Sequence, residues 1–203
     1  MKKKNSRPNI LFLMTDSWDG RMLGCLGHPA LRNATPNLDR LARRGMLFSQ
    51  AYTSHPICCP ARANLWSGKY TFHCESWNNH KGLEPGTTTF KDRLEREAGY
   101  VFASEVGGFG KHDYLSGAYS QLARMTAWTG PADIQLPVYR PSRPKVIDSR
   151  NIRRFEEDWK RCDQACAFLE CQSDNENPFF CYLGLSLPHP GFITNRYWLN
   201  LID

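Results

Sequence analysis

Long apolar runs are missing from this 203-residue sequence. The apolar run nearest the N-terminus, Ile10 to Met14, is shorter than the apolar core of roughly 7–15 residues in a signal peptide. No stretch approaches the ~20 apolar residues of a membrane-spanning helix. The printed residues therefore predict no membrane span and show no export signal, and they leave the localisation open.

Nucleic-acid-binding patterns are also missing. The formal net charge is +6, from 26 basic and 20 acidic residues. The basic residues are scattered, however, and no aromatic-basic RNA motif or zinc-finger spacing occurs. A solvated basic surface explains the small clusters and is compatible with anionic ligands. Nucleic acid is therefore not an expected partner.

Cysteine is plentiful, but the eight cysteines include no C-x-x-C pair. The even number leaves disulfides open, because their connectivity cannot be read from a sequence. Cys162 and Cys166 are one helical turn apart, which suits one face of a helix better than a zinc site.

Strand and helix patterns alternate after a basic tail at residues 1–8. The continuous apolar run at residues 9–14 predicts a strand buried on both faces. The other expected elements are strands at 46–53, 100–104 and 179–187, helices at 36–44, 61–67, 89–98 and 153–171, and a surface loop at 71–88. This alternation predicts one α/β domain with a mostly parallel sheet over residues 9–203.

Four chemically capable residues each follow an expected strand. They are Asp16, Cys58, Lys111 and His189. Ligands of open parallel sheets bind beyond the carboxyl ends of the strands. We therefore expect these four side chains to converge at one edge of the sheet.

The most informative motif is C-x-P-x-R, formed by Cys58, Pro60 and Arg62 and followed by Ser67-Gly68. It resembles the signature of the type I sulfatases, although Ala61 stands where serine is usual. In that family the cysteine is oxidised to Cα-formylglycine by the formylglycine-generating enzyme. A buried cysteine pair in a turn is the alternative interpretation.

The resemblance extends over about residues 8–190, through NILFLMTD, ESWNNHKGLEP, FGKHDY and YLGLSLPHP. These segments are most similar to the sulfatases that act on 2-sulfated glucuronate. The resemblance implies an alkaline-phosphatase-like α/β sandwich and a sulfuric ester hydrolase for sulfated sugars or aryl sulfates. A hydrated formylglycine would supply one hydroxyl to attack sulfur and a second to release the sulfate.

The resemblance also implies a role for each site residue. Asp16 and the formylglycine from Cys58 would bind Ca²⁺ or Mg²⁺. Arg62 and Lys111 would bind the sulfate, and His189 would protonate the leaving oxygen. The alternatives are an exposed loop acid, a surface arginine and a histidine in a proline-rich loop. His112 stands one residue before the position of a catalytic histidine in many sulfatases, and we assign it no role.

In this family a D-H-G or D-N-type motif later in the chain supplies further metal ligands, and no such motif follows the PHP segment in the 203 residues. We therefore expect residues 9–203 to be the N-terminal part of a sulfatase catalytic domain, from a truncated product or a partial gene model, without activity of its own. Two other hypotheses remain. One is a phosphodiesterase or phosphonate monoester hydrolase of the same fold, and the other is a noncatalytic protein that binds anionic glycans.

Overall fold

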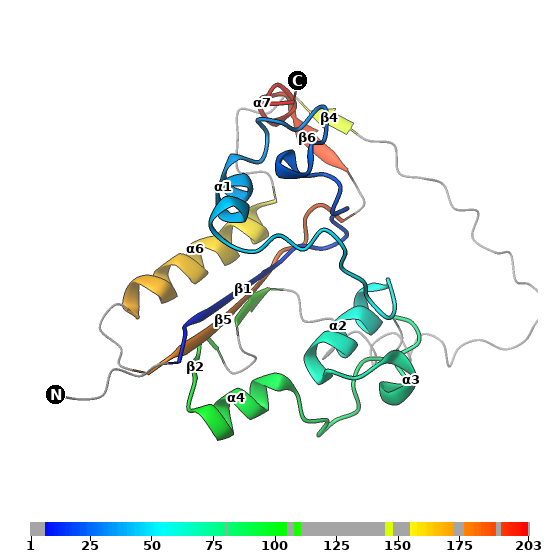
Figure 1. Ribbon diagram of the computed structural model, residues 1–203, viewed down its shortest axis with the longest axis vertical. Coiled ribbons are helices and arrows are strands. Elements are labelled where there is room, and N and C mark those ends of the chain that lie inside the picture. The colour runs from blue at the N-terminus through cyan, green and yellow to red at the C-terminus, as the bar shows by residue number, and fades with distance from the viewer. Residues whose placement is uncertain are drawn as a thin grey trace, which may run out of the picture.

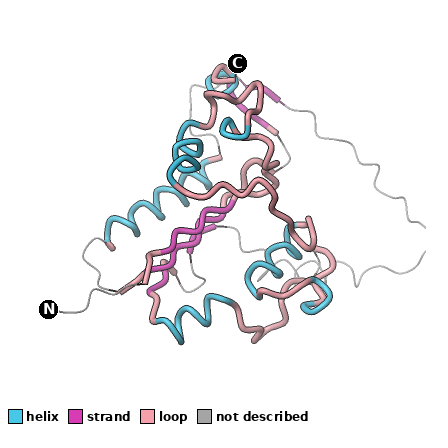
Figure 2. The backbone as a smooth tube through the Cα atoms, viewed as in Figure 1, coloured by secondary structure: helices cyan, strands magenta, loops and turns pink. Residues whose placement is uncertain are grey.

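A parallel β-sheet forms the centre of the computed structural model. The model describes residues 7–79, 81–104, 108–110, 145–147, 155–172, 177–189 and 192–202. The strands of the sheet are β1 (Ile10–Met14), β2 (Val101–Phe102), β3 (Gly108–Gly110) and β5 (Phe179–Gly184). Strands β1, β2 and β3 each pair with β5 in parallel; β1 lies on one side of β5, and β2 and β3 lie on the other (Figures 1 and 2). The predicted α/β class with a mostly parallel sheet is confirmed.

Helices cover both faces of this sheet. The longer helices are α1 (Pro36–Arg44), α2 (Cys58–Ser67), α4 (Phe90–Ala98) and α6 (Glu156–Cys171). Helix α6 lies on one face of the sheet, and α2 and α4 lie on the other (Figure 1). The short elements are η1 (Gly24–Leu26), α3 (Thr71–Cys74), the parallel pair β4 (Lys145–Ile147) and β6 (Ile193–Asn195), and α7 (Arg196–Leu199).

Aromatic packing holds α2 and α4 against the sheet. Trp66 of α2 is fully buried. It stacks on Phe90 of α4 at 4.6 Å between ring centroids and meets Tyr182 of β5 edge-on at 5.3 Å. Such aromatic contacts add to the stabilisation from burial alone. The start of α2, which carries the C-x-P-x-R motif, is therefore anchored to the central strand.

Local sequence signals explain where the helices begin and end. Helix α4 begins with a capping box, in which Thr89 and Asp92 satisfy each other's backbone N–H groups. Helix α2 ends at Gly68, whose φ of 69° is a conformation that glycine adopts at little cost. Helix α2 begins at Cys58, earlier than expected, so that Pro60 lies within its first turn, where its missing N–H is not needed.

Three expectations about local structure are wrong. Residues 46–53 form no strand. They run as an extended loop between α1 and α2, and Met46, Phe48 and Tyr52 are largely exposed (Figure 1). An apolar pattern does not form a strand when no neighbouring strand pairs with it. The segment 71–88 contains α3 and buries Cys74, Ser76 and Leu83 rather than forming only a surface loop.

The third error concerns β1, which is covered on only one face. Phe12 packs against the core beside α2 and α4, but Leu11 and Leu13 on the opposite face are 51% and 48% exposed. The reason is that α6 packs over β5 and β3 and does not extend across β1. One apolar face of an edge strand is therefore open in the described structure.

Two further findings concern disulfide bonds and membrane-spanning helices. All eight cysteines lie in the described part of the chain, and none forms a disulfide. Burial raises the pKa of the Cys181 thiol in β5 to about 11, so this thiol stays protonated at neutral pH. Among the described residues no helix has the length and apolarity that a bilayer crossing requires.

Candidate active site

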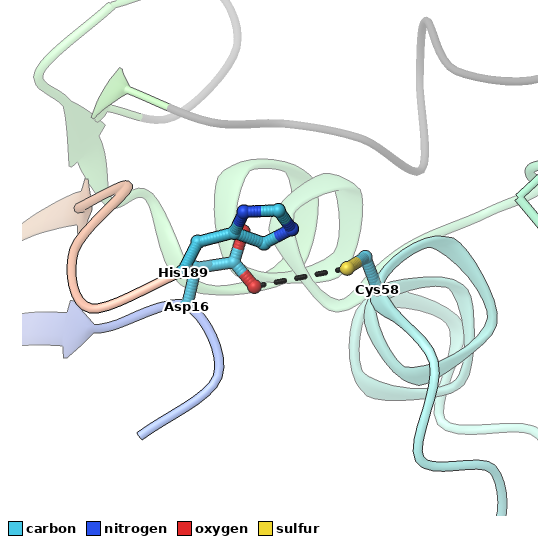
Figure 3. Close-up of side chains that lie close together, drawn as sticks. All are labelled: Asp16, Cys58 and His189. Carbon is cyan, nitrogen blue, oxygen red and sulfur yellow. Dashed lines mark hydrogen bonds between the residues drawn. The ribbon is translucent and has the colours of Figure 1, made fainter. Parts of the chain in front are cut away.

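Side chains from three distant segments meet at the carboxyl edge of the sheet. Asp16 follows β1, Cys58 is the first residue of α2, and His189 lies in the loop after β5. One ligand atom from each lies within 4.8 Å of the other two, and Cys58 Sγ is 3.7 Å from Asp16 Oδ1 (Figure 3). Three of the four residues expected to converge therefore do so. The fourth, Lys111, lies outside the described residues, as does His112.

The backbone holds Asp16 in a sharp turn. Its N–H donates to the carbonyl oxygen of Leu187 at 3.1 Å, and Ser17 directly after it has a φ of 62°. A left-handed conformation at a non-glycine residue is uncommon and is often found at functional sites. The turn directs the Asp16 carboxylate, which is only 3% exposed, toward the start of α2.

Among the residues that the structure describes, Arg62 forms an ion pair with Asp16. It is 1% exposed, and its Nη1 lies 4.0 Å from Asp16 Oδ1. A buried guanidinium beside a buried carboxylate offsets part of the cost of removing both charges from water. Arg62 follows Cys58 by one helical turn, so the two side chains lie on the same side of α2. A surface arginine, the alternative considered above, does not agree with this burial.

The two neighbouring cysteines have different environments. Cys58 is half-buried and faces Asp16, whereas Cys59 is buried and its thiol donates to the carbonyl oxygen of Lys81. The N–H of Cys59 donates to Asn79 Oδ1 at 2.9 Å. Asn79 thus satisfies one of the free N–H groups at the start of α2. No signal in the sequence indicates this role of Asn79, because a cap from a residue well after the helix leaves no local pattern.

Asp158 is a further residue that the sequence did not reveal. It lies in the first turn of α6, is 5% exposed, and accepts the backbone N–H groups of Ser186 and Leu187 at 2.9 Å. Arg161 donates to the same carboxylate at 2.8 Å and to the Ser186 hydroxyl at 2.9 Å. Because the N–H of His189 in turn donates to the Ser186 carbonyl, Asp158 holds the turn that carries His189.

Thiol, carboxylate, guanidinium and imidazole thus surround one point at the end of a parallel α/β sheet, with a C-x-P-x-R helix beneath them. Residues 8–199 match the family described as Sulfatase, and the chain belongs to this family. Among curated relatives, arylsulfatase K of Gallus gallus is 37% identical over 98% of this chain, and arylsulfatase K of Homo sapiens is 39% identical over 97%.

Solved structures support the same fold. A phosphonate monoester hydrolase of Agrobacterium radiobacter covers 97% of this chain with a TM-score of 0.64 and 21% identity, and the match spans 44% of that protein. A 2-O GAG sulfatase covers 91% of this chain with a TM-score of 0.58 and 24% identity, over 36% of that protein. The fold is alkaline-phosphatase-like, as the resemblance implied.

The chain spans about two fifths of the length of these curated relatives, 39% and 38%. Members of the family generally use a formylglycine and a divalent metal. The half-buried Cys58, which faces Asp16 with Arg62 beside it, fits the first of these. The metal fits only in part, since Asp16 is the one carboxylate of the described cluster and Ca²⁺ takes 6–8 oxygen ligands.

Proposed function

We propose that this chain forms the part of a sulfatase that contains the nucleophile, and that Cys58 is its formylglycine precursor. The observation that carries the proposal is the meeting of Cys58 with Asp16 and His189 at the end of the sheet. The C-x-P-x-R register supports Cys58 over Cys59, because only Cys58 has proline two residues later and arginine four residues later. The arylsulfatase names of the relatives agree with a sulfate ester as the substrate.

A hydrated formylglycine at position 58 would supply the attacking hydroxyl and, from the same carbon, the hydroxyl that releases sulfate. The thiol sulfur of Cys58 marks where these oxygens would lie, 3.7 Å from Asp16 Oδ1. Position 58 is the first residue of α2. The positive dipole end of a helix favours an anion at such a position.

The chain's own residues divide the remaining tasks. Arg62 would neutralise charge on the sulfate oxygens from its position in α2, and its burial keeps that interaction strong. His189 is the exposed member of the cluster, so its imidazole can reach a substrate from the solvent side and protonate the leaving oxygen. Lys111 would add a second positive charge to the sulfate, as the resemblance of its motif implies.

Ca²⁺ is the metal that we propose, with Mg²⁺ as the other hard cation of suitable chemistry. Asp16 and the formylglycine oxygens would hold it. When bound, such a cation withdraws charge from the sulfate and the attacking oxygen. The described residues provide only part of a coordination shell, and the proposed roles of Arg62 and His189 do not depend on the metal.

The substrate that we propose is a sulfated uronate or a related glycan. Two observations support a sulfated glycan: the motifs resemble sulfatases of 2-sulfated glucuronate, and a 2-O GAG sulfatase shares the fold. The formylglycine-generating enzyme is the partner needed for maturation. A noncatalytic glycan-binding protein would not need the convergence of Cys58, Asp16 and His189.

Maturation provides the decisive test. The chain would be produced together with a formylglycine-generating enzyme, and peptide mass spectrometry would locate the exchange of a thiol for an aldehyde oxygen. We expect conversion at Cys58, retained in Cys59→Ala and absent in Cys58→Ala. Conversion at Cys59, or none while a reference sulfatase made in the same cells is converted, would overturn the proposal. Release of sulfate from an aryl sulfate, compared with hydrolysis of an aryl phosphodiester, would then separate a sulfatase from a phosphodiesterase.

A further inference from the structure

A cavity of about 620 Å³ lies beside the His189 loop. Its walls come from the start of α6, the loop after β5, the β4–β6 pair and α7. Four aromatic side chains line it: Phe155, Trp159, Phe192 and Trp198. Small-molecule sites are typically about 300–1,000 Å³ and largely apolar, with a few polar groups that orient the ligand. The cavity therefore has the size and lining of a binding site for a ring.

His189 connects this cavity with the candidate active site. Its side chain belongs to the cluster with Asp16 and Cys58, and it also lines the cavity together with Leu187 and Pro188. His189 therefore belongs both to the cluster around Cys58 and to the wall of the cavity. In the proposed reaction His189 protonates the leaving oxygen, so the group attached to that oxygen lies next to His189 and within reach of the cavity that His189 lines.

The charges of the cavity restrict the ligand further. The Asp158 carboxylate is occupied by the N–H groups of Ser186 and Leu187 and by Arg161, so it has little capacity left for a ligand. Lys145 is exposed on β4 and lines the cavity, and no ion pair to another described residue engages it. A ring that carries a negative substituent would meet aromatic faces and one available positive charge.

We propose that this cavity binds the ring of the alcohol whose sulfate ester is cleaved. The proposal rests on the proposed function, because the role of His189 sets the position of the leaving group. Trp159 and Trp198 contact the faces of the ring, as aromatic side chains do with sugars and aryl groups. A uronate ring gains a contact between its carboxylate and Lys145, whereas an uncharged aryl ring does not.

Direct binding of the sulfate-free alcohols tests the cavity without any need for turnover. Methyl β-glucuronide and 4-methylphenol would be titrated against the purified chain, with saturation-transfer NMR and calorimetry as readouts. We expect Trp198→Ala to weaken both ligands by roughly tenfold, and Lys145→Met to weaken only the glucuronide. Val146→Trp, at a half-exposed position of the wall, should block both ligands while the fold is kept. Trp77→Ala, an exposed tryptophan that does not line the cavity, is the matched control.

The outcomes separate the two proposals. Ring binding that is unchanged by Val146→Trp, or no binding by the wild-type chain, would overturn the cavity inference even if Cys58 is converted. Binding that follows the expected order of variants while Cys58 stays unconverted would overturn the sulfatase proposal and, with it, the assignment of the ring as a leaving group. Loss of glucuronide binding alone in Lys145→Met would support the uronate, and equal losses of both ligands would exclude it.

Discussion

Replacing Asp158 with alanine should destabilise the fold and release the turn that carries His189. Asp158 accepts hydrogen bonds from three donors, the N–H groups of Ser186 and Leu187 and the Arg161 guanidinium, at 2.8–2.9 Å. Hydrogen bonds to a charged group contribute about 1.5–3 kcal/mol each, but losses within one network are not additive. Ser186 and Leu187 are half-buried, so water can replace part of what is lost.

The expected loss of unfolding free energy is therefore about 3 kcal/mol, the low end of the range for breaking a buried charge pair. Asp158→Asn keeps one acceptor oxygen and should cost about half as much. Glu157→Ala is the matched control, because it removes an acidic side chain from the same first turn of α6. It loses a dipole interaction of only about 0.3–1 kcal/mol and no hydrogen bond to the His189 turn.

Urea unfolding followed by circular dichroism measures these differences, at a concentration low enough to keep the chain monomeric. Two local readouts separate positioning from general stability. In Asp158→Ala the amide of Leu187 should exchange faster, and the imidazole NMR signal of His189, assigned by its loss in His189→Gln, should shift. Equal destabilisation by Glu157→Ala and Asp158→Ala, or an unmoved His189 signal, would refute the reasoning.

Three further predictions follow from other features. The Thr89 N–H lowers the pKa of Asp92, so its stabilisation is present above the unfolded pKa and disappears as the pH falls through the folded pKa. Asp92→Asn should therefore cost up to about 1 kcal/mol in urea unfolding at pH 7 and nothing in strong acid, and a pH-independent difference would contradict this. Leu11→Lys with Leu13→Lys should reduce self-association through the open face of β1, and sedimentation velocity unchanged from wild type would exclude that face. In an active preparation, Lys111→Ala should lower kcat by ~10²–10³ without moving the urea midpoint, and unchanged kcat would remove Lys111 from the site.

The elements that could be predicted from the sequence are those with strong local signals. The apolar runs of β1 and β5 and the ends of α1 and α4 appear where expected, because the signals for these elements lie within a few residues of one another. The segment 46–53 has an apolar pattern but no strand to pair with, and pairing depends on the whole sheet. Local pattern alone therefore overestimated the number of strands.

The candidate site follows the same division. The rule that strand ends converge correctly brought together Asp16 after β1 and His189 after β5. Cys58 reaches them from the start of α2 instead, because the strand expected before it does not form. Asp158 escaped notice because an acidic residue in the first turn of a helix is ordinary in any sequence. Its importance arises only when the fold carries Ser186 and Leu187 to it from 28 and 29 residues away.

The central position of β5 also has a consequence for timing. Within the described structure β1, β2 and β3 all pair with β5 and not with one another, so the sheet cannot close before residues 179–184 have been synthesised. At ~5–20 residues per second, the segment around Cys58 precedes β5 and His189 by on the order of ten seconds. During this interval Asp16 and His189 cannot yet shield the thiol, and a modifying enzyme has free access to it. Nascent chains stalled before β5 should accordingly be converted at Cys58 at least as readily as the folded chain, and slower conversion of the stalled chains would show that the folded site is what the enzyme recognises.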